Sequence, residues 1–260
     1  ISDICTDLRQ NTGRGKALML LIEKYGLFGA WADPTPLETG LSSKESLEQL
    51  IGKGAFKPLD LQALIHGTSQ NKFSTKDKRA LAVKLGFCLM DFFDAEITSK
   101  RIYFWEASKL GPRKEFPYLS FGSKLPATTD PYNFRMGHPA LLSFAKLLLE
   151  IDFGQAIELA ISPDSAQNQA AWATLVSLVD RLEEERSDSY LQAIRGCLNV
   201  HRKIAEKLRS RNLDDKRAEL RIRKTLYKEV VHKLELGLAE SIPRPAHKRQ
   251  RSESPPPTHR

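Results

Sequence analysis

The pattern of apolar and polar positions along this chain changes near Ser46. Before it, two apolar runs, Ala17–Ile22 and Leu27–Ala32, are separated by the short polar segment Glu23–Gly26. Two short apolar runs joined by a turn predict a β-hairpin. Beyond Ser46, apolar residues recur every three or four positions, which is typical of amphipathic helices. The pattern therefore predicts a mainly α (α+β) protein that begins with a hairpin.

The helical part of the pattern divides into several segments with recognisable ends. Ser74 or Thr75 is the expected cap of the second long segment, and Gly52 and Gly54 stop the first. The expected helices cover residues 47–51, 75–93, 139–151, 164–185, 190–198 and 214–238, with a shorter apolar piece at 59–65. Ile102–Trp105 is rich in β-branched and aromatic residues and predicts a strand. Gly111–Gly137 contains four prolines and predicts a long irregular segment.

These patterns predict three regions. Residues 1–45 form an N-terminal hairpin region, residues 46–240 a helical domain, and residues 241–260 a basic, proline-rich tail. Pro243–Arg260 holds five prolines and four arginines without apolar periodicity, so the tail is expected to be disordered.

Charge is concentrated in the last quarter of the chain. The whole protein carries a net charge of +8, yet residues 201–260 hold 17 Lys/Arg against 8 Asp/Glu, and the first 200 are nearly balanced. Such asymmetry indicates either a polyanionic partner, an import signal, or a solvated helix face followed by a basic tail.

Two basic clusters are candidate contact sites within this last quarter. The candidate polyanion contacts are Arg202, Lys203, Lys207, Arg209 and Arg211. Phosphate contacts of this kind are salt-dependent and blind to sequence. Nearby acidic residues favour the alternative, a helix with internal ion pairs. The candidate nuclear-import cluster is Lys248, Arg249 and Arg251.

Other chemistries have little support in the sequence. Cys5, Cys88 and Cys197 lack zinc-ligand spacing and are expected to be reduced, mostly buried thiols. Glu106 and Glu115 are single carboxylates in a loop and are expected to be solvated. No metal, cofactor or membrane span is predicted, and an intracellular location, cytoplasmic or nuclear, is expected because no secretion signal opens the chain.

One short segment resembles a known family. Ser143–Ile151 reads Ser-Phe-Ala-Lys-Leu-Leu-Leu-Glu-Ile, and it resembles the central helix of the large lobe of protein kinases. Asp152-Phe153-Gly154 spells the kinase metal-binding triplet, but in a kinase that triplet precedes this helix. Its position here favours a helix end with a glycine stop.

Other segments extend the resemblance to residues 1–238. Ser46–Ile51 resembles the helix after the kinase hinge, and Thr75–Phe93 resembles the long helix before the catalytic loop. The chain as a whole is similar to a fungal family of kinase-like domains of unknown function, with which it shares segments like Ile1–Cys5, Ile102–Phe104 and Leu226–Val231. The resemblance implies a protein-kinase-like large lobe behind a short hairpin remnant of the small lobe.

The same resemblance implies that catalysis is lost. Phosphoryl transfer needs metal-binding carboxylates, a phosphate-binding Lys and an Asp base. The catalytic Asp position falls near Glu96, the metal-binding Asn near Arg101, and the metal triplet at Ser120-Phe121-Gly122. Ala140 replaces the Asp that braces the catalytic loop in kinases. The first 45 residues are too few for a Gly-rich loop and its paired Lys.

Three hypotheses remain open. The first is a non-catalytic, pseudokinase-like interaction or signalling module, whose protein partner binds the Gly111–Gly137 segment or the groove that a nucleotide would otherwise occupy. The second is a nuclear, nucleic-acid-associated protein that uses the basic 201–251 region. The third is an active but divergent kinase.

Overall fold

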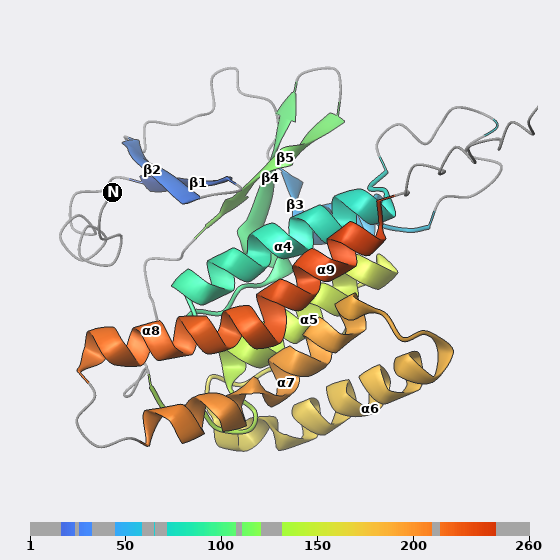
Figure 1. Ribbon diagram of the computed structural model, residues 1–260. Helices are drawn as coiled ribbons and strands as arrows, with labels where there is room; N and C mark the ends of the chain where they lie inside the picture. The colour runs from blue at the N-terminus through green and yellow to red at the C-terminus, as the bar shows by residue number, and fades with distance from the viewer. Residues whose placement is uncertain are drawn as a thin grey trace, which may run out of the picture.

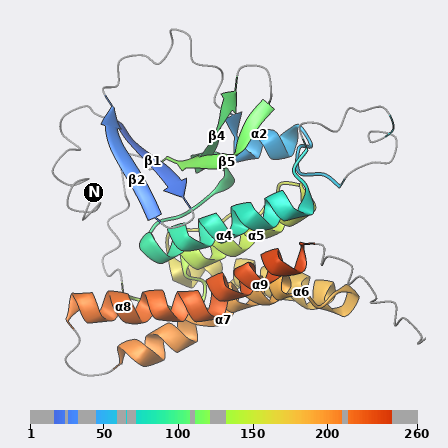
Figure 2. The same ribbon diagram turned by 45° about the horizontal axis from the view of Figure 1, so that its top comes forward.

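The computed structural model of the protein describes residues 17–23, 26–32, 45–58, 65, 72–107, 111–120, 132–209 and 214–242. Strands gather on one side of the molecule, and helices stack beneath them (Figures 1 and 2). The protein is mainly helical, as the sequence predicts. The predicted apolar piece at 59–65, apart from Ile65, and the tail at 243–260 lie outside the described residues.

The strands form one antiparallel sheet. Its members are β1 (Ala17–Glu23), β2 (Gly26–Ala32), β3 (Glu45–Ser46), β4 (Ile102–Ala107) and β5 (Gly111–Leu119), in the order β2-β1-β5-β4-β3. β1 and β2 pair from Ala17↔Ala32 to Glu23↔Gly26, which confirms the predicted hairpin. The sheet joins strands from both sides of residue 46, because β1 pairs with β5 at Leu21↔Tyr118.

The prediction that Gly111–Gly137 is irregular throughout is wrong for its first nine residues. They form β5, which pairs with β4 from Ile102↔Leu119 to Ala107↔Gly111. Prolines argued against a strand because they cannot donate a hydrogen bond to a ladder. Here β5 has an extended ladder on one side only, so Pro117 can sit opposite Phe104 without breaking the sheet. Residues 132–138 are irregular as predicted.

Two helices near the sheet begin with a reciprocal hydrogen-bonded cap. These are α2 (Leu47–Gly52) and α4 (Thr75–Asp91). Ser46 accepts from the backbone of Gln49, whose side chain accepts from the backbone of Ser46, and Ser74 and Asp77 do the same for α4. Each pair satisfies two backbone donors that a helix start leaves free.

The remaining helices follow from α5 to the C-terminal end of the described residues. They are α5 (Pro139–Phe153), the 3-10 turn η2 (Ser165–Asn168), α6 (Gln169–Glu185), α7 (Ser189–Leu208), α8 (Asp215–Leu226), the π-helix η3 (Tyr227–Val231) and α9 (His232–Glu240). α7 extends ten residues beyond the predicted end at Leu198, so it also carries the candidate residues Arg202, Lys203 and Lys207.

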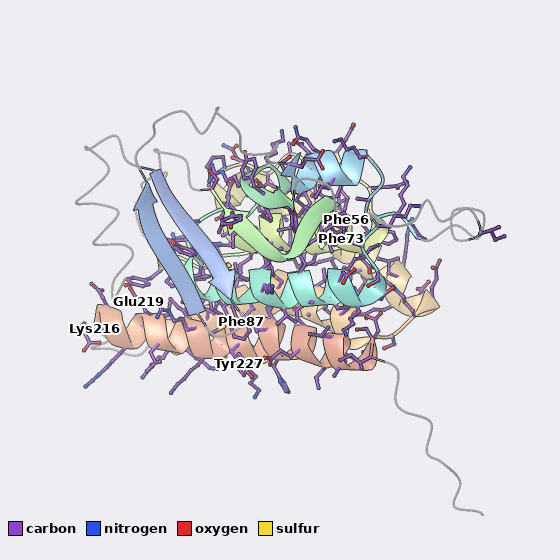
Figure 3. All side chains as sticks on the ribbon, turned by 90° about the horizontal axis from the view of Figure 1, so that it is seen from above. Phe56, Phe73, Phe87, Lys216, Glu219 and Tyr227 are labelled. Carbon is purple, nitrogen blue, oxygen red and sulfur yellow. The ribbon has the colours of Figure 1, made fainter. Side chains whose placement is uncertain are left out.

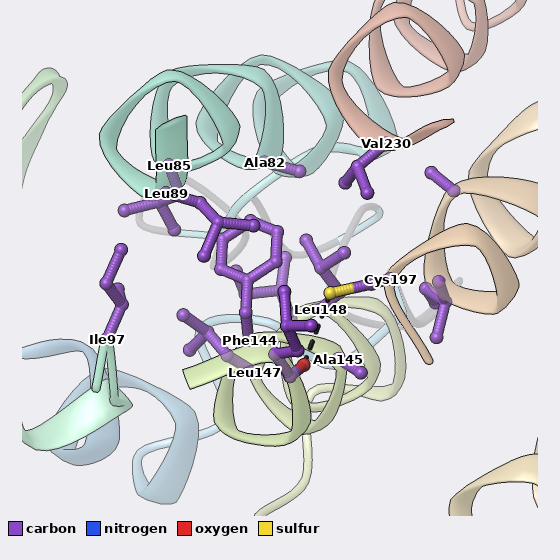
Figure 4. Close-up of a cluster of buried hydrophobic side chains, with 14 of the residues drawn as sticks. Ala82, Leu85, Leu89, Ile97, Phe144, Ala145, Leu147, Leu148, Cys197 and Val230 are labelled. Atoms are coloured by element: carbon purple, nitrogen blue, oxygen red, sulfur yellow. Dashed lines mark hydrogen bonds between the residues drawn. The ribbon is translucent and has the colours of Figure 1, made fainter. Parts of the chain in front are cut away.

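α5 lies at the centre of the hydrophobic core. Eleven of its residues are buried, namely all of Ala140–Ile151 except Lys146. A helix that is apolar on nearly all sides must be surrounded by other elements. Leu85 and Leu89 of α4, Cys197 of α7 and Val230 of η3 contribute to the cluster around Phe144 and Leu148 (Figure 4).

The π-helix η3 lies where α7 passes closest to the α8–α9 helix. A side chain at Gly196 would overlap the carbonyl oxygen of Glu229, so only glycine permits this approach. Lys203 of α7 forms an ion pair with Glu229 at 2.7 Å. π-helical turns are uncommon and often mark positions of functional or packing constraint. Here the extra residue of the turn sits at a close helix crossing.

Candidate functional site

The loop between α4 and β4 meets the end of β5 at one point. Ser120 donates its backbone N–H to the carbonyl oxygen of Arg101 at 2.8 Å, just beyond the Ile102↔Leu119 pair. The positions to which the kinase resemblance assigns the metal-binding Asn and the first residue of the metal triplet are therefore adjacent. Phe121 and Gly122 lie outside the described residues.

Apolar anchors shape this loop. Ala95 and Ile97 are buried with Ile102, and the backbone N–H of Ala95 donates to the carbonyl oxygen of Phe92 at 3.0 Å. Glu96 lies between the two anchors and is half-buried. Lys100, in the 3-10 turn η1 (Ser99–Arg101), lies 3.6 Å from Glu48 of α2. The loop is thus held between the core and the first helix.

The two described side chains at this junction include no carboxylate. Arg101 is half-buried and brings a positive charge, and Ser120 is exposed and brings a hydroxyl. Mg²⁺ prefers carboxylate oxygens with near-octahedral geometry. Among the described residues there is no group of three or more His, Cys, Asp or Glu side chains that could hold a metal ion. The expectation that Glu106 and Glu115 lie in a loop is wrong, because they lie on strands β4 and β5.

A charged cluster with a buried centre surrounds Asp152, in the last turn of α5. We call it the Asp152 cluster; it consists of Lys78, Arg79, Asp152, Arg186, Asp188 and Tyr190. Arg79 lies 2.9 Å from one carboxylate oxygen of Asp152, and Arg186 forms an ion pair with the other. The ammonium of Lys78 donates to the backbone carbonyl of Asp152 at 2.9 Å. The cluster connects α4, α5 and the α6–α7 turn.

Every charged group in the Asp152 cluster has a partner. The Arg79 guanidinium also lies 3.8 Å from Asp188 and 3.5 Å from the centre of the Tyr190 ring. Tyr190 donates its hydroxyl to the carbonyl of Leu148 at 2.8 Å, and burial raises its pKa. Burial lowers the pKa of Lys78, although the nearby Asp152 opposes this shift. We therefore interpret the cluster as a clamp between helices.

Only part of this clamp could be predicted from the sequence. Gly154 ends α5 in the left-handed conformation with φ 66°, which confirms the predicted glycine stop after Asp152-Phe153. The ionic role of Asp152 was missed because its partners lie more than thirty residues away on either side. The signal that was available is the pair Lys78-Arg79 on the apolar face of a helix, where charged residues are rare unless paired.

His138 lies directly before α5, where its side chain packs as a ring and does not cap the helix. Its ring stacks on Phe134 with centroids 4.6 Å apart, and it makes no side-chain cap bond. Its Nδ1 is buried without a hydrogen-bond partner. Burial, followed by the charge of His201, lowers the pKa of His138 to about 4. The ring is therefore neutral at neutral pH.

The four candidate polyanion contacts in the described chain are all exposed, and they differ in whether they have an internal partner. Lys203 pairs with Glu229, and Lys207 donates to the hydroxyl of Thr225 at 3.1 Å. Arg202 and Arg209 are exposed, and neither has an ion pair with a carboxylate in the described part of the chain. Arg211 and the candidate import cluster, Lys248, Arg249 and Arg251, lie outside the described residues. Of the four candidates in the described chain, two thus have an internal partner and two have no ion pair.

Two cysteines are buried as predicted. Burial raises the pKa of the Cys88 thiol to about 12, and burial also raises that of Cys197. Cys197 donates to the carbonyl of Leu141 at 3.2 Å. Thiols in such surroundings are unreactive. Cys5 lies outside the described residues.

A search for membrane-spanning helices among the described residues finds none that is long and apolar enough.

Comparison with known families gives one match. The model of a family described as a domain of unknown function, DUF7580, matches residues 1–241. Comparison with curated proteins gives no match, and comparison with solved structures gives none.

Proposed function

We propose that this chain, which belongs to the DUF7580 family of domains of unknown function, is a non-catalytic, kinase-like interaction or signalling module. The kinase-like relationship and the fungal origin are part of this proposal and rest on the sequence resemblance. Family membership itself is established over residues 1–241. If the chain has a kinase-like origin, Arg101 and Ser120 stand at positions that bind metal ions in active kinases.

The observation that carries the proposal is the contact between Ser120 and Arg101. In a kinase, the residues at the two ends of the corresponding hairpin bind the metal ions that neutralise the transferring phosphoryl group. Here the side chains at these two positions are the hydroxyl of Ser120 and the guanidinium of Arg101. The backbones of the two residues are joined by a hydrogen bond of 2.8 Å. A guanidinium at this point repels a metal cation, and a hydroxyl is a weak ligand for one. This chemistry supports binding without phosphoryl transfer.

The start of α5 agrees with the same proposal. Ala140 is 2% exposed and packs in the core, where the resemblance implies an aspartate that braces the catalytic loop of a kinase. An apolar side chain contributes packing and gives no hydrogen bond to the loop. The loop before β4 is instead held by Ala95 and Ile97, which are buried. It is thus fixed without the bonds that align a catalytic base.

A nucleotide titration of the full chain tests the proposal. Thermal unfolding is followed with ATP, with and without Mg²⁺, since a ligand that binds the folded state raises its stability with the logarithm of ligand concentration. We expect no Mg²⁺-dependent shift and no transfer of radiolabelled phosphate to a generic substrate. A Mg²⁺-dependent shift accompanied by transfer would overturn the proposal.

A gain-of-ligand variant makes the test sharper. In the double variant Arg101→Asn and Ser120→Asp, both kinase-type ligands are restored at adjacent positions. If the junction corresponds to a degenerate metal site, Mn²⁺ should bind to the double variant and not to Arg101→Asn alone, as measured by electron paramagnetic resonance. Equal binding by the two variants would contradict the assignment of these positions.

The alternative, a nucleic-acid-associated protein using residues 201–251, stays a prediction. Its best candidates in the described chain are Arg202 and Arg209, because Lys203 and Lys207 have internal partners. Filter retention of DNA and RNA at several salt concentrations tests it. Retention that is lost in the double variant Arg202→Gln and Arg209→Gln would favour this alternative.

A further inference from the structure

The outward side of the α8–η3 helix carries a mixed basic and apolar surface. We call it the α8 face; it consists of Lys216, Leu220, Lys224, Tyr227 and Lys228. The spacing of three, four and seven residues places these side chains on one side of a helix. Leu220 is 52% exposed, Tyr227 is 39% exposed, and the three lysines are exposed. Figure 3 shows Lys216 and Tyr227 along this helix, with Phe87 of α4 toward the body of the protein.

The three lysines of the α8 face have no ion pair with a carboxylate in the described chain. Two carboxylates near them in sequence have other partners: Asp214 pairs with Arg217 at 3.7 Å, and Glu219 pairs with Arg223 at 3.7 Å. Asp215, which directly precedes Lys216, is exposed. Glu229 pairs with Lys203 at 2.7 Å and lies 3.8 Å from Lys233. The charge of Lys228 acts on Glu229, but none of the three lysines is held in an ion pair within the described chain.

Acidic side chains limit the α8 face at both ends. Asp214 and Asp215 lie at the start of α8, and both are exposed. Beyond the other end, Glu235 accepts a hydrogen bond from the Tyr227 hydroxyl at 3.0 Å, which also fixes the ring. The basic part from residue 216 to residue 228 is about 18 Å long at 1.5 Å per helical residue. The surface thus fits a short anionic partner better than a continuous one.

We propose that the α8 face is a docking surface for a short, acidic, amphipathic helix of a partner protein. Leu220 and Tyr227 would be covered by apolar side chains of that helix, and the lysines would face its carboxylates. Helices with apolar side chains at spacings of three, four and seven residues commonly bind in this way. This deepens the proposed function, because it names the surface and the chemistry of the partner for an interaction module.

Two other anionic partners fit less well. A nucleic acid strand or an anionic membrane continues past both ends of the face, where it would meet Asp214, Asp215 and Glu235. A phosphate backbone also gives no favourable contact to exposed Leu220. Two large apolar side chains are few for a helix that lies in a membrane interface, which buries a full apolar side. Complementary charge and apolar burial together favour the acidic helix.

The test uses the full chain and a designed probe. The probe is a fluorescein-labelled peptide of about 14 residues, long enough to span the face, with leucines at positions 1, 4, 8 and 11 and glutamates between them. A scrambled peptide of the same composition, a single-stranded oligonucleotide of similar length and phosphatidylserine vesicles are measured in parallel. We expect binding of the amphipathic peptide, and at least about tenfold weaker binding of the other three, because apolar and charged contacts must coincide.

Matched variants locate the binding surface. The triple variant Lys216→Glu, Lys224→Glu and Lys228→Glu reverses the charge of the α8 face. The control, Lys57→Glu, Lys76→Glu and Arg181→Glu, makes the same change of net charge at exposed residues of other elements. We expect about a tenfold loss for the first and less than about twofold for the second, since complementary charge acts locally at physiological salt. The double variant Leu220→Ala and Tyr227→Ala should weaken binding without altering its salt dependence.

Several outcomes would overturn the proposal. Equal losses in the two triple variants would show that net charge alone attracts the peptide. Equal binding of the scrambled peptide, or tighter binding of the oligonucleotide or vesicles through the same lysines, would assign the face to another partner. No binding of the amphipathic peptide at about 1 mM, where even weak contacts of about 4 kcal/mol are seen, would also reject it. None of these results changes the expectation for ATP, so the two proposals fail separately.

Discussion

The Asp152 cluster and the α8 face are both rich in charge, and they differ in how that charge is compensated. In the cluster, the Arg79 and Asp152 side chains are 6% and 8% exposed, and each has partners on other helices. On the α8 face, Lys216, Lys224 and Lys228 point to solvent without an ion pair in the described chain. A buried charge must be paired for the protein to fold, whereas an exposed charge is available to a partner. The first region therefore serves the structure, and the second is open to recognition.

Removing the centre of the cluster should have the largest effect. In Asp152→Asn, the buried Arg79 loses its closest counter-charge while Lys78 remains nearby. Loss of one partner of a buried ion pair costs about 3–5 kcal/mol, since the other charge stays buried. Urea unfolding, followed by circular dichroism, measures the change in the free energy of unfolding.

The matched control for Asp152→Asn is Asp180→Asn. Asp180 is 2.6 Å from Arg195, a comparable ion pair, but the two side chains are 52% and 36% exposed. Exposed pairs contribute about 0–1 kcal/mol. If both variants lose the same stability, burial is not what distinguishes the cluster.

Lowering the pH should decrease the free energy of unfolding, because the buried His138 side chain is neutral in the folded protein. The pKa of His138 is about 4 in the folded protein, below its ordinary value, chiefly because of burial. The unfolded chain therefore binds more protons between pH 6.5 and 4, so stability falls as the pH falls through this window, by up to about 3 kcal/mol. His201, whose pKa is also lowered by burial, contributes in the same direction.

The variant His138→Phe isolates this contribution. It keeps an aromatic ring beside Phe134 and removes the titrating group. Its stability should depend less on pH than that of the wild type, as measured by urea unfolding at pH 7, 6, 5 and 4.5. An unchanged profile in His138→Phe would show that other groups cause the acid sensitivity.

A side chain at Gly196 should disturb the packing of α7 against the α8–α9 helix. The added methyl group would overlap the carbonyl oxygen of Glu229, and the backbone cannot yield without moving the helix. Overpacking of this kind costs about 1–3 kcal/mol. Gly52→Ala is the control, because nothing lies within 4 Å of the added atom. Thermal unfolding should show a loss for Gly196→Ala and no loss for Gly52→Ala.

The smallest effect is expected on the α8 face itself. Lys224→Glu changes an exposed charge that has no ion pair in the described chain, so the free energy of unfolding should change by less than about 0.5 kcal/mol. The same substitution should weaken binding of the acidic peptide. A loss above about 1.5 kcal/mol in a chemical denaturation curve would mean that Lys224 has a structural role, and it would remove the contrast with the Asp152 cluster.

Periodic segments with clear ends could be predicted from the sequence. The hairpin at 17–32, the cap at Ser74 and the end of α5 at Gly154 depend on neighbours within a few residues, and all three are found. β5 pairs with the neighbouring β4 in the same way, but it was not predicted, because its two prolines argue against a strand locally. A helix around residues 202–211 is expected from the basic cluster, and Val200 and Ile204 recur at helical spacing and are buried, but the continuity of this stretch with the helix that begins at Ser189 was not predicted.

Sites that depend on distant contacts were less accessible. The pairing of Lys203 with Glu229, and of Arg79 with Asp152, joins residues on separate helices. Sequence spacing groups the basic residues of α7 together. In the fold, however, Lys207 donates a hydrogen bond to Thr225, whereas Arg202 is exposed. The α8 face was not singled out, because its basic residues become a surface only when the acidic ones are paired elsewhere.

The π-helix between α8 and α9 sets the rotational phase of the C-terminal helix. A π-helical turn uses about one residue more than an α-helical turn for nearly the same rotation, so the extra residue within Tyr227–Val231 is absorbed locally and Val230 and Leu234 still face the core. Deleting one residue within this turn would let it wind as an α-helix with little rotation of α9, whereas a deletion in a regular α-helix rotates everything beyond it by about 100°. This turn is therefore the place along the C-terminal helix where the loss of one residue is best accepted.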